Sequence, residues 1–570
     1  MGFQPITYGG LEARTESLYK VVGSERLVVQ KDANWWRHAV IYQIYPRSFA
    51  DGNGDGMGDL PGVLSRLDSL KALGIDAIWF SPFFRSPQKD AGYDVADYKD
   101  IDPLFGTLAD FDAVLEKAHS LGIRVIIDLV PNHSSDQHPL FQAALKAGKG
   151  SPEREMYHFR DGKDANTPPN NWPSVFGGNA WTQIEDGQWY LHIFDSSQPD
   201  FNWDNPKVTE FFHDVLRFWF DRGVDGFRVD VAHSLIKAPG LPDIEEISTS
   251  MTGSDSEPQE EKPHPYWGQE GVHEIIRGFR KVANEYEDRA MCAEAWVLPL
   301  SKMAKWVRPD EYHQTFNFGY LSTGWKSADL RKVVDESLRE FGGVGAPSTW
   351  VLSNHDVIRH VTRMAYDEVP KQGDGIGPDY PQPDEARGQR VGRAATAFML
   401  ALPGSSYLYQ GEELGLPEHT TLEAKYREDP TFFRTNGERV GRDGCRVPIP
   451  WEADKPAFGF NNTGKSWLPQ PENYRRYARS AQEGVAGSTL ELYRQLLKVR
   501  KQFNLGMGSL RWVEELCDET TLAFDNSGVR VIANFAGTVA LPAGELLVTT
   551  QHDLTIEGVL EHDQVAWIRL

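Results

Sequence analysis

The chain has 570 residues, more than one compact core usually holds, and two or three domains are expected. Its composition is globular, with 40% hydrophobic and 25% charged residues, while a formal net charge of −23 opposes binding to nucleic acid or to an anionic membrane. No apolar run approaches the roughly 18 residues of a membrane span, and the N-terminal stretch lacks the apolar segment of a signal peptide, so a cytoplasmic protein is expected.

Short β-rich runs alternate with amphipathic segments along most of the chain, which is typical of parallel βα units. Apolar residues recur every three or four positions in segments such as 60–74, 108–122 and 385–402, a pattern that predicts helices. The predicted strands are residues 40–45, 76–80, 124–130, 226–232, 290–296, 313–318, 348–353 and 405–411. Eight such units favour a (β/α)₈ TIM barrel over an open sheet.

Two stretches depart from this pattern. Residues 134–205 are rich in Asn, Pro, Gly and Trp and are too long for a structureless loop, so we interpret them as a small inserted domain after the third strand. Residues 508–570 alternate strands with turns and predict a C-terminal antiparallel β-domain, which leaves 1–133 and 206–507 for the barrel. The acidic stretch 240–265 is interpreted as a solvated loop.

Polar side chains collect at the C-terminal ends of the predicted strands. Active sites of (β/α)₈ barrels lie at that face of the barrel. The four stretches are DLVPNH (128–133), GFRVDVAHS (226–234), AEAW (293–296) and LSNHD (352–356). In the second of them, neighbouring strand residues point to opposite faces, so Arg228 and Asp230 share one face while Val231 lies on the apolar face. An arginine and an aspartate are thus aimed at the same place.

The side chains at these ends favour acid–base or carboxylate-nucleophile chemistry over acyl transfer, because they include three carboxylates but no thiolate and no Ser–His pattern. Glycoside cleavage uses one ionised and one protonated carboxylate. We expect Arg228 to lower the pKa of Asp230 and to keep it anionic. The apolar neighbours of Glu294 are expected to raise its pKa.

Together the four stretches resemble the α-amylase superfamily, glycoside hydrolase family 13, from about residue 35 to residue 451. The resemblance implies that Asp230 is the nucleophile, Glu294 the general acid/base and Asp356 the carboxylate that binds two hydroxyls of the sugar. It also implies that three further side chains contact the same ring or orient the nucleophile, namely His133, His355 and Arg228. Retention of the α-anomer would follow, with the two reacting carboxyls about 5 Å apart.

Three more stretches resemble the oligo-1,6-glucosidase subfamily and its α-glucosidases. They are QPDFNW (198–203), DAGYD (90–94) and GRDGCRVPIPW (441–451). The resemblance implies that Asp90 binds hydroxyls at the tip of the terminal glucose with Arg442 as its partner. Such a charged pair leaves no room for a sugar chain to continue, so cleavage would be exo.

The same resemblance describes the rest of the glucose pocket. Tyr93 would stack under the ring, and Phe176 and Phe194 look like the apolar wall. The residue after the nucleophile, here Val231, is associated with linkage, valine leaning to α-1,6 and threonine or alanine to α-1,4. GFRVDVAHS also resembles some α-1,4-cleaving α-glucosidases, so both linkages stay open, since one side chain shifts only ~1–3 kcal/mol.

A metal site is suggested by the stretch DGNGDGMGD (51–59), which has alternating oxygen ligands. Gly62 stands where an EF-hand needs a bidentate Glu, so an EF-hand is excluded. The stretch resembles the subfamily's calcium loop, which implies a structural Ca²⁺, with Mg²⁺ as the alternative, bound by Asp51, Asn53, Asp55, Asp59 and the Met57 carbonyl. No organic cofactor is expected. The three cysteines, Cys292, Cys445 and Cys517, indicate neither a disulfide framework nor a zinc site.

The expected partner is a small α-linked disaccharide or oligosaccharide, with no nucleic acid, no membrane, and either a monomer or a homo-oligomer. The same site could instead transfer the glucosyl group or isomerise a disaccharide, as trehalose synthases and sucrose isomerases do. Some family members are non-catalytic, such as the heavy chains of amino-acid transporters. Those usually lack a catalytic carboxylate and carry a membrane span, whereas this sequence has all three carboxylates and no such run.

Overall fold

The computed structural model describes residues 31–244 and 264–570, so residues 1–30 and most of the predicted 240–265 loop lie outside the described part of the chain. Within that part, none of the helices has the length and apolar content needed to cross a bilayer.

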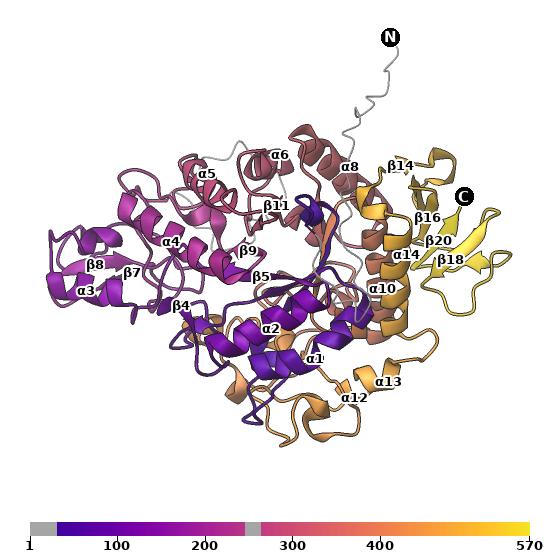
Figure 1. The fold of residues 1–570 in the computed structure, drawn as a ribbon, viewed down its shortest axis with the longest axis horizontal. Coiled ribbons are helices and arrows are strands. Elements are labelled where there is room, and N and C mark those ends of the chain that lie inside the picture. The colour runs from indigo at the N-terminus through magenta and orange to yellow at the C-terminus, as the bar shows by residue number, and fades with distance from the viewer. Residues whose placement is uncertain (1–30, 245–263) are drawn as a thin grey trace, which may run out of the picture.

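Eight parallel strands form the centre of the molecule, and helices surround them (Figure 1). The strands are β1 (Val40–Ile44), β2 (Ala77–Phe80), β5 (Arg124–Leu129), β9 (Gly226–Val229), β10 (Ala290–Ala293), β11 (Gln314–Thr315), β12 (Thr349–Val351) and β13 (Ser405–Tyr409). Their order is β11-β10-β9-β5-β2-β1-β13-β12, and a parallel bridge from Phe316 to Thr349 joins the two outer strands. The predicted (β/α)₈ barrel is therefore confirmed.

The predicted helices form because their ends are capped as well as patterned. The main helices of the barrel are α1 (Leu60–Leu73), α2 (Leu108–Ser120), α4 (Pro206–Arg222), α5 (Val272–Ala283), α8 (Ser327–Gly343) and α10 (Glu385–Ala401), followed by α14 (Thr489–Gln502). Asp59 accepts a hydrogen bond from the Gly62 amide at the start of α1, and Gly74 ends that helix at φ 97°, a conformation that glycine adopts without strain. Thr107 and Asp110 form a capping box at the start of α2.

The insertion between β5 and α4 extends to one side of the barrel (Figure 1). It contains α3 (Pro139–Ala147) and a small antiparallel sheet in the order β6-β8-β7, formed by Phe159–Asp161, Gln188–Leu191 and Trp181–Gln183. The helix was not expected from the sequence, because its nine residues are too few for a clear helical period. The insertion itself was expected, and its exact boundaries stay a prediction.

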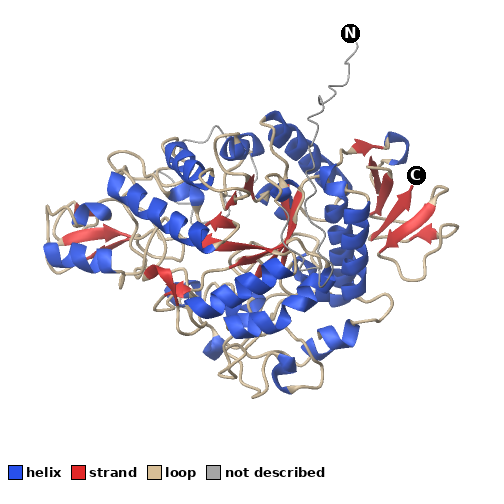
Figure 2. Cartoon of the chain, in the orientation of Figure 1, coloured by secondary structure: helices blue, strands red, loops and turns tan. Residues whose placement is uncertain are grey.

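The C-terminal region forms a separate antiparallel sheet in the order β14-β15-β16-β20-β18 (Figure 2). Its strands are Arg511–Trp512, Thr521–Asn526, Val529–Asn534, Gln564–Arg569 and Glu545–Thr549. The indole of Trp567 donates a hydrogen bond to the Ala397 carbonyl on α10, which ties this sheet to the barrel. The predicted C-terminal β-domain is therefore present.

Candidate active site

The strand that carries Arg228 is shorter than expected. β9 ends at Val229, and Val231 lies beyond it with φ at 41°, an unusual conformation for a β-branched residue. The expectation that Val231 continues the apolar face of the strand is wrong, because the chain turns there. Its side chain instead packs in the apolar cluster that contains Phe176 and Phe194 of the insertion.

The turn places a backbone donor on the expected acid/base. The Val231 amide donates to Glu294 Oε2 at 2.8 Å, and the Trp296 indole donates to the other carboxylate oxygen at 3.2 Å. The surroundings of Glu294 are thus polar on both oxygens, which corrects the apolar environment expected from its sequence neighbours. Local backbone strain of this kind costs about 1–3 kcal/mol and is typical of functional sites.

One guanidinium binds three carboxylates at the centre of the site. Arg228 Nη1 lies 2.6 Å from Asp230 and 2.9 Å from Asp128, and its Nη2 lies 3.1 Å from Glu294. All four side chains are buried. The contact of Arg228 with Asp230 is the one that strand alternation indicated, while its contacts with Glu294 and Asp128 were not expected. Asp128 opens the DLVPNH stretch, and that position was its only signal in the sequence.

Burial sets the protonation of this cluster. Burial raises the pKa of Asp230 well above its ordinary value, Arg228 opposes the rise, and Glu294 and Asp128 add to it. The expectation that Arg228 would keep this pKa low is thus corrected for the ligand-free protein. Burial likewise raises the pKa of Asp128 to about 7 against the attraction of Arg228. The three carboxylates around one guanidinium disfavour one another's ionised forms, which adds to the effect of burial.

The expected ion pair at the glucose tip is present. Arg442 Nη2 lies 3.0 Å from Asp90, and the same guanidinium contacts Asp356 at 2.9 Å and Asp429 at 2.7 Å. Arg446 contacts Asp356 at 3.0 Å. Burial acts to raise the pKa of Asp356, but the neighbouring positive groups, Arg442 and Arg446 among them, outweigh it and hold that pKa below its usual range.

Aromatic and imidazole rings line the space between these two groups. Tyr93 stacks on His355 with ring centroids 5.4 Å apart and planes 5° apart, and its hydroxyl also donates to Asp128 at 3.0 Å. Phe194 packs against His133 at 5.2 Å, and Phe176 lies 5.1 Å from the Arg442 guanidinium. The expected side chains therefore come together from the strand ends, the insertion and the loops after β2 and β13.

Several residues of the site were missed by the sequence reasoning. The Gln198 amide lies 3.1 Å from Asp90 and 3.2 Å from His133, so it joins two expected sugar-binding side chains. Its position in QPDFNW was the available signal. Arg446 lies in the stretch GRDGCRVPIPW, which was its available signal. Asp429 had none, because its contact depends on how the loop after β13 folds back over the barrel.

The expected metal loop follows β1 and is held by side-chain to backbone hydrogen bonds. Asp51 accepts from the amides of Gly54 and Gly56, and Asp59 accepts from those of Gly52 and Gly62. Each carboxylate keeps further lone pairs. Across residues 31–244 and 264–570, no three His, Cys, Asp or Glu side chains are arranged to hold a metal ion.

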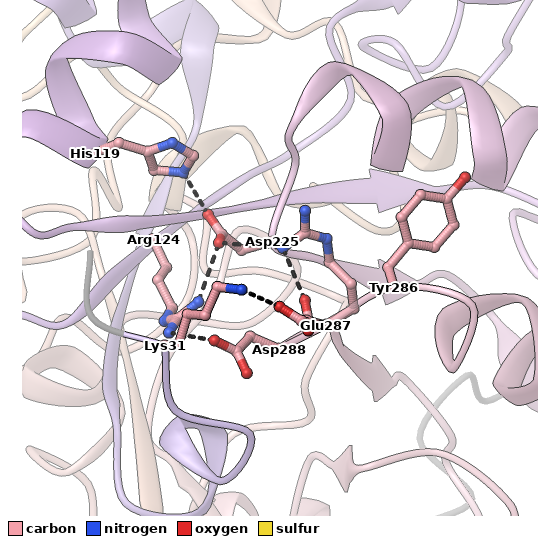
Figure 3. A pocket seen from close by; sticks show the side chains of 8 residues that line it. Lys31, His119, Arg124, Asp225, Tyr286, Glu287 and Asp288 are labelled. Carbon is pink, nitrogen blue, oxygen red and sulfur yellow. Dashed lines mark hydrogen bonds and ion pairs between the residues drawn. The ribbon is translucent and has the colours of Figure 1, made fainter. Parts of the chain in front are cut away.

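A cavity of about 400 Å³ lies at the opposite end of the barrel, where the strands begin (Figure 3). Asp225 is at its centre and accepts from His119 at 2.7 Å and from Arg124 at 3.2 Å, while Lys31 pairs with Glu287. Its cations face carboxylates of the same cavity. This end of a barrel generally serves stability, so we do not assign catalysis to it.

The Asp90 carboxyl makes stability depend on pH. Burial raises its pKa to about 7, although Arg442 and Arg446 oppose the rise. Because an unfolded Asp titrates near 4, the unfolded chain loses a proton between about pH 4 and pH 7 that the folded chain keeps, so this group's contribution to the free energy of unfolding falls as pH rises. The Asp90→Asn variant cannot ionise there. Urea denaturation should therefore show that the free energy of unfolding of the variant increases relative to wild type as pH rises from about 4 to about 7. A difference between the two proteins that does not change with pH would contradict the raised pKa.

Asp230 and Glu294 are two of the three carboxylates that contact Arg228, and they lie at the strand ends of a closed parallel barrel. Glycoside hydrolases use such a pair of carboxylates. The model described as "Alpha amylase, catalytic domain" matches residues 43–506. The chain therefore belongs to the alpha-amylase family.

Relatives of known name extend over most of the chain. A probable alpha-glucosidase of Rhizobium meliloti is 37% identical and covers 94% of this chain and 96% of its own. An oligo-1,6-glucosidase of Parageobacillus thermoglucosidasius is 36% identical over 83% of this chain and 84% of its own. Two solved structures are similar to this chain. The alpha-glucosyl transfer enzyme XgtA has a TM-score of 0.78 and 35% identity, with 94% of this chain and 99% of its own covered. The trehalulose synthase MutB of Pseudomonas mesoacidophila MX-45 has a TM-score of 0.80 and 30% identity, with 94% of this chain and 99% of its own covered.

Proposed function

We propose that this chain is an exo-acting, retaining α-glucosidase that releases glucose from the non-reducing end of short α-glucosides. The buried contact of Arg442 with Asp90 and Asp356, beside the Arg228 cluster, carries this proposal. In this proposal, the Arg442 contact closes one end of the space that a glucose ring would occupy. The relatives named as alpha-glucosidase and oligo-1,6-glucosidase support it.

The proposed reaction has two displacements. Asp230 attacks the anomeric carbon of the terminal glucose while Glu294 gives its proton to the departing oxygen, so the glycosidic bond breaks as an ester to Asp230 forms. Glu294 then takes a proton from water, which attacks the same carbon and releases Asp230. Arg228 orients both carboxylates, and the Val231 amide and Trp296 indole hold Glu294 in place.

Product analysis on maltose, isomaltose and sucrose tests the proposal. Free glucose should be the main new product from at least one of the first two substrates, with no accumulation of longer sugars at low substrate concentration. New disaccharides as the main products would instead show that a sugar acceptor outcompetes water.

Glucosyl transfer or disaccharide isomerisation is the second candidate function. The similarity to XgtA and MutB favours it, and so does an aromatic stack beside the acid/base. Trp296 lies on Phe318 with centroids 3.6 Å apart and planes 3° apart, and it is only partly buried. Such a surface could hold an acceptor sugar where the leaving group departs.

Val231 is expected to bias the linkage preference, which stays open between α-1,4 and α-1,6. In the Val231→Thr variant the ratio of kcat/KM for isomaltose to that for maltose should fall by about 5- to 150-fold, the effect of one small side chain at a binding site. Because both residues are β-branched, the backbone strain at this turn changes little. An unchanged ratio would show that Val231 does not influence linkage.

The proposal includes a structural Ca²⁺ in the 51–59 loop, with Mg²⁺ as the alternative. The alternating oxygen side chains support it. Adding Ca²⁺ to chelator-treated protein should raise Tm by about 2–5 °C, through binding to the folded state alone. Asp55 is exposed, so the Asp55→Asn variant should fold but lose this rise. The absence of any rise in wild type with either ion would refute the metal site.

The proposed location is the cytoplasm. Cys292, Cys445 and Cys517 are all free thiols, which suits a reducing compartment. Cell fractionation with an antibody to the protein would test this location.

A further inference from the structure

A second cavity, of about 420 Å³, lies on the outer side of the glucose-tip wall. It is lined by the loops after β1, β2 and β13 and by the insertion. Five of its side chains are basic, namely Arg47, Lys89, Arg427, Arg434 and Arg446, against three acidic ones, Asp195, Glu428 and Asp443. The lining of this cavity thus has more basic than acidic side chains, whereas the chain as a whole has a net charge of −23.

Two of these cations have no carboxylate partner. Arg427 is 4% exposed, and its guanidinium donates to the backbone carbonyls of Val440 at 2.9 Å and Leu422 at 3.0 Å. Lys89 is exposed. Within the described residues, no carboxylate lies within ion-pair distance of either side chain. Asp443, Glu418 and Asp429 act on Arg427 only from beyond ion-pair distance. Its two recorded hydrogen bonds leave further N–H donors of the guanidinium for an anion in the cavity.

The remaining cations are only partly offset. Arg434 lies 3.3 Å from Asp195, and Arg47 lies 3.3 Å from Glu428, whose side chain is half exposed. Arg47 also lies over the ring of Trp467 at 4.3 Å, which gives the cavity an aromatic wall. Several guanidinium groups around one space are typical of sites that bind phosphate.

We propose that this cavity binds a phosphate group, either as free phosphate or carried on a small sugar. The site is distinct from the glucose pocket, because Asp90 and Arg442 form the wall of that pocket and neither lines this cavity. Arg446 belongs to both sides, since it lines the cavity and contacts Asp356 at 3.0 Å. The inference does not depend on the proposed hydrolytic activity.

Isothermal titration of the full chain with inorganic phosphate and with glucose 6-phosphate, at constant ionic strength, tests this site. One phosphate per chain should bind to wild type. The Lys89→Glu variant should bind at least about tenfold more weakly, because it replaces an unpaired cation with an anion. The matched control is Lys332→Glu on α8, an exposed lysine with no ion pair among the described residues, which should bind as wild type does.

The two ligands distinguish free phosphate from a phosphorylated sugar, and added glucose distinguishes this cavity from the glucose pocket. Equal affinity for both ligands would identify free phosphate as the whole ligand, and binding of glucose 6-phosphate alone would identify a phosphorylated sugar. Saturating glucose should leave phosphate binding unchanged. Competition by glucose, no binding of either ligand, or equal binding by wild type and Lys89→Glu would overturn the proposal, and each readout is independent of catalysis.

Discussion

Replacing Asp230 with asparagine is expected to lower kcat by about 10⁴- to 10⁶-fold, because the variant cannot form the covalent glucosyl ester. Asparagine has nearly the same shape and removes one of three acids around Arg228, so the fold should be retained. Steady-state kinetics with an aryl α-glucoside measures the loss. In the Asp230→Gly variant, which leaves space where the carboxylate stood, azide should partly restore turnover by attacking the anomeric carbon, with formation of a β-glucosyl azide and release of the aryl group.

The matched control for this variant is Asp525→Asn. Asp525 is also a buried aspartate in contact with an arginine, 2.8 Å from Arg530, but it lies in the C-terminal sheet. Its loss should leave kcat unchanged. Normal turnover in Asp230→Asn would contradict the assignment of the nucleophile.

The Arg442→Gln variant should lose both stability and substrate binding. Arg442 contacts three buried or partly buried carboxylates, and removal of one partner from a buried ion pair costs about 3–5 kcal/mol of unfolding free energy. Because Asp90 and Asp356 lose their common partner, kcat/KM should fall by at least about 100-fold. Chemical denaturation and steady-state kinetics measure the two effects.

Arg475→Gln provides the comparison. Arg475 pairs with Asp454 and Glu472, but its side chain is half exposed, so the same substitution should change stability by less than about 1 kcal/mol and leave kinetics unchanged. Equal losses in both variants would show that the Arg442 network has no special role.

Much of the fold could be predicted because it depends on local patterns. Eight β-rich runs alternating with amphipathic helices indicate a barrel, and the composition of 134–205 indicates an insertion. Helix α3 was not predicted, since a nine-residue helix in a segment rich in Pro and Gly leaves little periodic signal. Seven of the eight strands also end earlier than expected, because the residues at their C-terminal ends belong to the loops that follow.

The site could be predicted only where a motif carries it. Asp230 and Glu294 lie in short recognisable stretches, and the Arg228–Asp230 contact follows from strand alternation, whereas the contact of Arg228 with Glu294 does not. The polar environment of Glu294 could not be predicted, because it depends on a backbone turn at Val231 and on burial by segments far apart in the sequence. The pKa of Asp230 is a similar case, since the net balance between burial and Arg228 needs the full three-dimensional arrangement.

The central claim is that glucose leaves this site with retained α-configuration after a covalent intermediate. Proton NMR of the first glucose released from an aryl α-glucoside, recorded before mutarotation, tests it most directly. We expect α-glucose as the initial product. Initial release of β-glucose would contradict the double displacement and the role given to Asp230.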